Sequence, residues 1–176
     1  MKKSLRYIAG YVIGFIIFLI LIPLLIYFIS NIFDSLIGIR ILNTLTLRLI
    51  ISAPFFAVGI LFILWSNIVL FRIGSGGPTE GLGLEISPPT KKLVTVGPYR
   101  YTRNPMILGT FFMYFGLAVF LDSIFTFCLI ILFLIITSVC LKNTEEKRLL
   151  KDFGDEFVRY RNSVPIIIPF TKIEKR

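Results

Sequence analysis

Residues 105–141 read PMILGTFFMYFGLAVFLDSIFTFCLIILFLIITSVCL, and Asp122 is the only charged residue among them. Asp122-Ser123 divides this stretch into two apolar blocks, 105–121 and 124–141. An apolar block of about 20 residues matches the hydrocarbon thickness of a bilayer, and both blocks are slightly shorter than that. Pro105 suits the first turn of a helix. We therefore predict two membrane-spanning helices that form a hairpin with a tight turn at Asp122-Ser123.

Two further apolar blocks precede this hairpin, at about 7–29 and 46–71. The first follows a basic start, as a signal peptide does, but its apolar run is longer and no small-residue cleavage site follows it. We therefore expect an uncleaved membrane anchor, with a kink at Pro23. A short polar connection is expected between the two blocks, at 31–43.

Composition supports the same fold class. The 176 residues are 56% hydrophobic and 16% charged, whereas soluble domains are about a quarter charged. We predict a single all-α integral membrane domain, 1–176, with four transmembrane helices. Its parts are two amino-terminal spans in 1–71, a cytoplasmic loop at 72–104, the hairpin 105–141, and a cytoplasmic helix and tail at 142–176.

The charged residues indicate orientation. The formal net charge is +9, and the basic residues flank the apolar blocks, which argues against a nucleic-acid partner. Three Lys and Arg precede the first span, five lie in 72–104 and nine in 142–176, while Arg40 and Arg48 alone lie near the first connection. The positive-inside rule then predicts a multi-pass protein of the cell membrane or an endomembrane, with both termini cytoplasmic.

The chain offers little metal chemistry. It has no His, the commonest metal ligand and the commonest general base at neutral pH. Its two Cys, Cys128 and Cys140, are twelve residues apart on one predicted helix, roughly 18 Å, which is too far for a disulfide. We predict no metal site.

The tail continues the last span as an amphipathic helix. Apolar residues recur at 149, 153 and 157, between charged flanks. This spacing predicts one apolar stripe on a helix that lies on the membrane surface. Gly154 is expected to bend the helix, and the prolines at 165 and 169 to end it.

The hairpin brings two polar clusters together, Gly97–Asn104 before its first helix and Glu145-Glu146 after its second. Two interpretations remain open from the residues alone. Arg103 and the acidic pair could hold a zwitterionic ligand, whose anionic group the amino end of the helix at Pro105 would also attract. Alternatively, the clusters are an ordinary basic membrane border and a solvated acidic helix end.

Two motifs carry a resemblance to a known family. They read PPTKKLVTVGPYRYTRNPMILG at 88–109 and EEKRLLKDFGDEFVRYRNSVPIIIP at 145–169. In this order and spacing they resemble the isoprenylcysteine carboxyl methyltransferase family, which groups with membrane phospholipid methyltransferases. The resemblance covers about 74–170.

The resemblance implies S-adenosylmethionine as the methyl donor, bound at the cytoplasmic ends of the last two helices. The positions that it marks as cofactor contacts are Lys91, Lys92, Leu93, Val94, Tyr99, Asn104, Pro105, Met106, Ile107 and Glu145. No catalytic residue is assigned, and the candidates are Arg103, Glu146 and Tyr101. The Gly-rich piece at 74–78 is not a dinucleotide fingerprint, because it does not join a strand to a helix. It is read as either a flexible loop or a lid over the cofactor.

The sequence departs from the family pattern at three positions. The family's His is often Asn, as Asn104 is here, and Ile107 stands where the family has Tyr. Prenylcysteine enzymes carry an Arg before the acidic pair, whereas this region reads Leu141-Lys142. The expected function is therefore methyl transfer to a membrane-embedded lipid-like acceptor, such as an isoprenoid carboxylate or a phospholipid amine. The alternative is a non-catalytic membrane scaffold or accessory protein with the same fold. The oligomeric state is left open.

Overall fold

The computed structural model describes residues 3–74 and 90–169, and all secondary structure in these ranges is helical. The elements are α1 (Lys3–Phe15), a π-helical turn (Ile16–Leu21), α2 (Ile22–Ile37), α3 (Leu45–Val69) with a π-helical end (Leu70–Gly74), a 3-10 turn (Gly97–Arg100), α4 (Pro105–Leu121), α5 (Ile124–Asn143) and α6 (Glu145–Ser163). The all-α prediction is confirmed. Most of the Gly-rich piece and the last residues of the tail fall in 75–89 and 170–176, outside the described residues.

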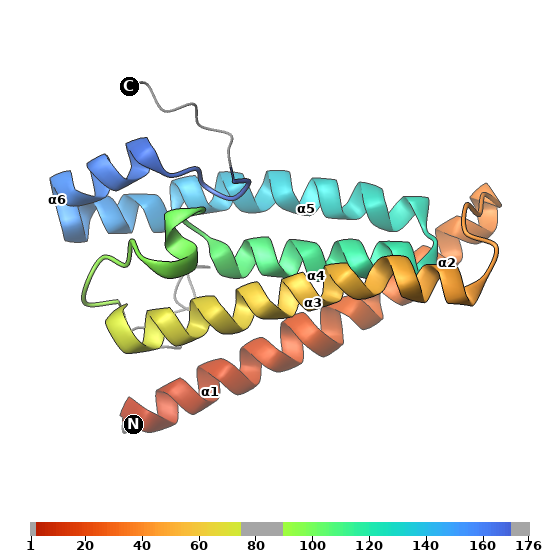
Figure 1. Cartoon of the computed structure of the whole chain (residues 1–176), viewed down its shortest axis with the longest axis horizontal. Coiled ribbons are helices and arrows are strands. Elements are labelled where there is room, and N and C mark those ends of the chain that lie inside the picture. The colour runs from red at the N-terminus through yellow and green to blue at the C-terminus, as the bar shows by residue number, and fades with distance from the viewer. Residues whose placement is uncertain (1–2, 75–89, 170–176) are drawn as a thin grey trace.

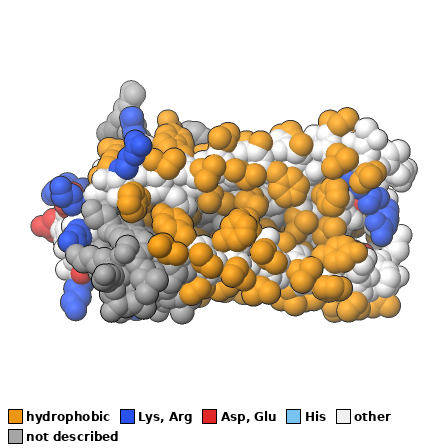
Figure 2. Space-filling model, turned by 90° about the horizontal axis from the view of Figure 1, so that it is seen from below, with side chains coloured by type: hydrophobic (Ala, Val, Ile, Leu, Met, Phe, Trp, Pro, Cys, Tyr) orange, Lys and Arg blue, Asp and Glu red, His pale blue; other side chains and the backbone are white. Residues whose placement is uncertain are grey.

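Long apolar helices run side by side along the molecule (Figure 1). Within 3–74 and 90–169, three segments are long and apolar enough to cross a bilayer: Gly10–Leu36, Leu45–Gly74 and Ile124–Asn143. Figure 2 shows hydrophobic side chains over the middle of one face, with Lys and Arg at the two ends. The chain therefore has the form of an integral membrane protein. At 17 residues α4 is about 26 Å long, so its crossing stays a prediction.

The amino-terminal helix is longer than predicted. The connection expected at 31–43 was wrong in its first half, because residues 31–37 complete α2. Gly38 ends the helix with a left-handed backbone (φ 69°), and its N–H donates to Asp34 O at 2.9 Å. The apolar residues Ile32, Phe33 and Leu36 among the polar ones continue the helical pattern.

Pro23 alters the hydrogen bonding of the helix in the turn that precedes it. In the preceding π-helical turn the N–H of Ile22 donates to Ile17 O, five residues back. The next bond of this kind, to Phe18 O, would need an N–H on Pro23, which proline lacks. The Tyr114 hydroxyl of α4 donates to Phe18 O at 2.9 Å instead. This contact joins the amino-terminal helix to α4 at the point where the irregular turn occurs.

Two glycines let α3 and α4 pack backbone to backbone. A Cβ atom on Gly59 would lie 2.7 Å from Gly109 O, and one on Gly109 would lie 2.7 Å from Gly59 O. Gly116 continues the contact, since its Cβ would lie 3.2 Å from Ser52 O. Small residues at a membrane helix interface permit this close approach. The packing fixes the register in which the end of α3 lies beside the start of α4.

The turn between α4 and α5 is as predicted. Asp122 takes a left-handed backbone (φ 53°), and the Ser123 side chain accepts from Thr126 N at the start of α5. The buried Asp122 carboxylate accepts from the N–H groups of Ile41 and Leu42 and lies 3.3 Å from Arg48 Nη2. An ion pair between the buried Asp122 and the partly buried Arg48 therefore closes this end of the bundle.

At the other end, α6 bends as predicted. Gly154 has a non-helical backbone (φ 49°, ψ −126°), and the second half of the helix doubles back along the first (Figure 1). Phe157 and Tyr160 are buried in this fold-back, together with Val164. The chain beyond α6 reaches the residues before α4, where Pro165 O accepts from Arg103 N at 2.9 Å. The tail therefore packs on the segment that precedes the hairpin.

Candidate functional site

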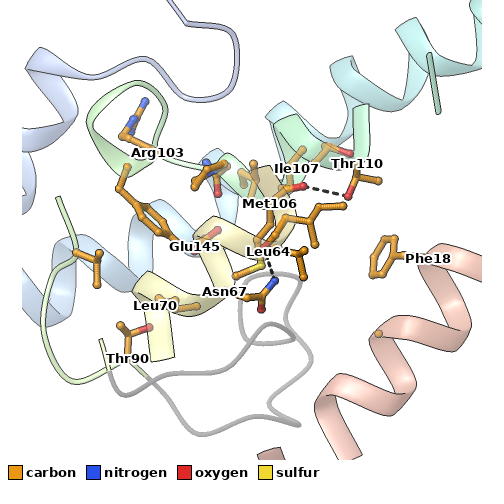
Figure 3. A pocket seen from close by; sticks show the side chains of 18 of the residues that line it. Phe18, Leu64, Asn67, Leu70, Thr90, Arg103, Met106, Ile107, Thr110 and Glu145 are labelled. Carbon is orange, nitrogen blue, oxygen red and sulfur yellow. Dashed lines mark hydrogen bonds between the residues drawn. The ribbon is translucent and has the colours of Figure 1, made fainter. Parts of the chain in front are cut away.

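A cavity of about 620 Å³ lies where α3 ends and α4 begins, with α6 on one side and α1 on another (Figure 3). Its wall draws on all six helices except α2, on the π-helical turn and on the segment that precedes α4. The wall is polar near α6 and the start of α4, and apolar between α1, α3 and α5. The volume is within the range of small-molecule sites, roughly 300–1,000 Å³.

The polar end contains a buried ion pair. Arg103 Nη1 donates to the Glu146 carboxylate, and the two side chains are only 8% and 14% exposed. Arg103 Nε is buried and has no hydrogen-bond partner. Burial lowers the pKa of Arg103, and Glu146 opposes this shift. The guanidinium is therefore a cation at the cavity wall whose buried Nε–H has no partner.

Two tyrosines form a second part of the polar end. Tyr160 of α6 donates its hydroxyl to Tyr99 O at 2.7 Å, which holds the 3-10 turn against the tail. Burial first, and then the nearby Glu145 and Tyr160, raise the pKa of Tyr99. Its phenol therefore stays protonated at neutral pH. Val94 and Tyr99 are both buried, so they offer an apolar wall beside the ion pair.

Asn104 lines the cavity, but its amide nitrogen is engaged elsewhere. Asn104 Nδ2 donates to Ile166 O at 2.9 Å, and the buried Thr102 hydroxyl donates to the same oxygen at 3.3 Å. The carboxyl-terminal segment thereby holds the residues that lead into α4. The Asn104 side chain has a structural task in addition to any ligand contact.

The apolar part of the cavity lies between the amino-terminal helix and the rest of the bundle. Figure 1 shows α1 leaning away from α3 towards its amino end. Phe15 and Phe18 line the cavity from this side, and Leu64 of α3, Met113 of α4 and Phe133 of α5 from the others. An apolar chain fits such a wall.

One amide interrupts this apolar wall. Asn67 Nδ2 donates to Ile63 O at 2.8 Å, one turn back in α3 (Figure 3). Asn67 Oδ1 is buried and has no hydrogen-bond partner. An oxygen facing Ile63 O would repel it, so the amide orientation follows from the neighbour. A buried acceptor without a partner is uncommon, and it marks a place for a donor.

The cavity brings most of the predicted residues together. Nine of the ten expected cofactor contacts line it: Lys92, Leu93, Val94, Tyr99, Asn104, Pro105, Met106, Ile107 and Glu145. Arg103 and Glu146 line it as well. The expected contact Lys91 is exposed and lies outside the described wall, as does the candidate Tyr101. The backbone N–H of Lys91 donates to Gly74 O, which joins the segment before α4 to the end of α3.

The sequence reasoning missed the wall that α1 and α3 supply. Phe15, Phe18 and Leu64 stand in apolar spans, where a wall residue has the same side-chain type as a lipid-facing one. Asn67 did carry a signal, because it is the one amide in the apolar block 46–71. A polar residue inside a membrane span is costly unless it has a function.

These features define a class: a helical membrane protein with a cavity that is polar at one end and apolar at the other, suited to an amphipathic ligand. The phospholipid methyltransferase family model matches residues 47–156, well over half of the chain. The protein therefore belongs to this family of membrane methyltransferases, whose substrates are lipid-like, and the resemblance in the sequence is confirmed. A comparison with curated proteins gives no match.

Proposed function

We propose that the protein transfers a methyl group from S-adenosylmethionine to a lipid-like acceptor, at the cytoplasmic end of the helix bundle. One observation carries the proposal: a single cavity joins a polar end to an apolar wall between membrane helices. A soluble charged donor and an apolar acceptor need those two surfaces side by side.

The residues at the polar end fit the donor, a zwitterion with a cationic sulfonium and a flat base. Arg103 Nε is a buried donor without a partner, which suits the carboxylate. The first turn of α4 adds backbone N–H groups that have no partner within the helix. The buried wall of Val94 and Tyr99 suits adenine. The carboxylates of Glu145 and Glu146 favour the cationic groups.

When bound, the donor supplies a methyl group on a positively charged sulfur, which the acceptor's lone pair displaces in line. The protein's part is to orient the two molecules and exclude water. The segment 102–104 is held by the tail, and Glu146 fixes the Arg103 guanidinium. The polar end is therefore organised before a ligand enters.

We assign Glu145 as the group that takes a proton when the acceptor has one to lose. Tyr99 stays protonated at neutral pH, since its pKa is raised. Glu146 already holds the Arg103 guanidinium at the donor's end, and Tyr101 lies outside the described wall. Glu145 lines the cavity beside these residues. An acceptor that is already an anion would not need this group.

The cytoplasmic placement rests on charge. The start of α1, the start of α4 and all of α6 lie at one end of the bundle (Figure 1). The segments that carry most Lys and Arg are at this end. By the positive-inside rule this end and both termini face the cytoplasm.

The test has two parts, on purified protein in detergent. Calorimetry should show binding of S-adenosylmethionine, and Glu145→Gln should weaken it, whereas Glu156→Gln should not, because Glu156 is an exposed carboxylate of the same helix. Methyl transfer from a labelled donor into a lipid extract then separates an enzyme from a scaffold. Absence of donor binding by the unaltered protein would refute the proposal.

A further inference from the structure

The acceptor's chemistry can be narrowed from the position of Asn67. The close glycine contact pairs Gly59 with Gly109, and Ile63 N lies 3.0 Å from where a Gly109 Cβ would be. Because α3 and α4 run in opposite directions, Asn67, one turn beyond Ile63, lies level with the first turn of α4. Asn67 therefore stands at the boundary between the polar end and the apolar wall.

The free oxygen of Asn67 requires a particular kind of partner. Its Oδ1 is buried without a hydrogen bond, while Nδ2 is already engaged with Ile63 O. Such an oxygen interacts favourably with an N–H or O–H group and unfavourably with an ionised carboxylate.

The neighbouring residues do not supply a site for a carboxylate acceptor. Leu141 is 1% exposed and packs with Leu108 and Ile167, and Lys142 is exposed and lies outside the described wall. Arg103 is already paired with Glu146 and stands at the donor's end. Among the described wall residues, the other side chain with a buried polar atom that lacks a hydrogen-bond partner is Asn67.

We propose that Asn67 Oδ1 accepts a hydrogen bond from an N–H or O–H group on the head group of the methyl acceptor, and that it thereby selects lipids that carry such a donor. The inference rests on the proposed function, because it assigns the acceptor side of the same cavity. Asn67 is then a specificity residue for the methyl acceptor, and the affinity of the protein for the methyl donor does not depend on Asn67.

The test compares lipids that are alike except for the N–H or O–H group of the head group. Dioleoyl phosphatidylethanolamine has N–H groups, and dioleoyl phosphatidylcholine has the same phosphate and chains without them. Dioleoylglycerol and its methyl ether form the matching hydroxyl pair. Apparent affinities come from the rise in melting temperature with lipid concentration in mixed micelles, so turnover is not required.

The variants are Asn67→Leu, which keeps the volume and removes the oxygen, and Ser66→Ala. Ser66 is fully buried beside Asn67 and also donates to Ile63 O, at 3.0 Å, but lies outside the described cavity wall. The unaltered protein and Ser66→Ala should prefer the donor-bearing member of one pair by about 10- to 100-fold, the range expected for a buried hydrogen bond. Asn67→Leu should lose that preference and bind S-adenosylmethionine as before.

The lipid pair that shows the preference identifies the hydrogen-bond donor of the head group as an amine or a hydroxyl. The inference is overturned if the unaltered protein shows no preference in either pair, or if Asn67→Leu keeps it. It is also overturned if Asn67→Leu weakens the binding of S-adenosylmethionine to the same extent, since Asn67 then belongs to the site of the methyl donor. Failure of the unaltered protein to bind S-adenosylmethionine refutes the proposed function separately, and the lipid preference is still measured.

Discussion

Replacing Glu146 by Met should destabilise the protein by about 3–5 kcal/mol, because it leaves a buried cation without its partner. Arg103 and Glu146 are 8% and 14% exposed, so solvent screens neither of them well. Arg103 Nε already lacks a hydrogen bond, and the substitution removes the charge that favours the guanidinium in this place. At about 2–4 °C per kcal/mol the melting temperature should fall by roughly 6–20 °C.

The double variant Arg103→Met/Glu146→Met tests the cause. With both charges gone, two apolar side chains of similar length fill the space, and a buried pair replaced in this way is often neutral in stability. The double variant should therefore be more stable than Glu146→Met alone. It should still fail to bind S-adenosylmethionine, because the donor's carboxylate loses its buried partner. Stability and binding would then separate.

Unfolding in detergent can be followed through Trp65, the single Trp of the chain, whose indole nitrogen lies 3.4 Å from where a Gly97 Cβ would be. Arg148 and Asp152 form the control pair on the same helix, with side chains 28% and 42% exposed and 3.5 Å apart. Asp152→Asn should cost less than about 0.5 kcal/mol, as exposed pairs do. The reasoning is refuted if Glu146→Met is equally mild, or if the double variant is as unstable as the single one.

Three other predictions concern packing and protonation. Gly109→Ala should separate α3 from α4 and cost about 1–3 kcal/mol in the same unfolding assay, because the new Cβ would lie 2.7 Å from the backbone oxygen of Gly59; unchanged stability would contradict the packing. Tyr114→Phe should cost about 1–3 kcal/mol, since it leaves Phe18 O without a donor; it is checked by the same assay, and a loss near zero would show that the carbonyl has another partner. The pKa of Tyr99 is raised in the folded protein, so its protonated phenol favours folding. This contribution is fully present below pH 10.0, the ordinary pKa of a tyrosine, and above that pH it is lost by about 1.4 kcal/mol per pH unit. Between pH 9 and 11 the free energy of unfolding should therefore fall more steeply with pH for the unaltered protein than for Tyr99→Phe. Parallel curves would show that Tyr99 ionises as readily in the folded protein as in the unfolded chain.

The parts of the fold that local chemistry decides could be predicted from the sequence. Asp122-Ser123 interrupts an uncharged run, and Pro105 can only begin a helix there, so the hairpin follows from those residues. Gly154 bends α6 for the same local reason. The end of α2 at Gly38 was missed, because a few polar residues among apolar ones resemble a loop when the helical spacing is not counted.

The contacts that join distant segments could not be predicted in this way. Nothing in the composition of the tail shows that Ile166 O accepts from both Thr102 and Asn104. A backbone carbonyl carries no signal in the side-chain sequence, and its partner is more than 60 residues away. The same holds for Phe18 and Tyr114, although Pro23 did mark the place where a carbonyl would lose its partner.

The limits of the family match bear on how the site divides between its two ligands. The match covers 47–156 and therefore includes the polar end, from Arg103 to Glu146. It begins after α1 and the π-helical turn that follows, whose Phe15 and Phe18 form one side of the apolar wall. Methyl-donor chemistry is what members of such a family share, and the wall that admits the acceptor is supplied in part by a helix outside the match. The family membership consequently supports the reaction type. The identity of the acceptor has to be read in part from Phe15 and Phe18, which precede the match, together with Asn67 of α3, which lies inside it.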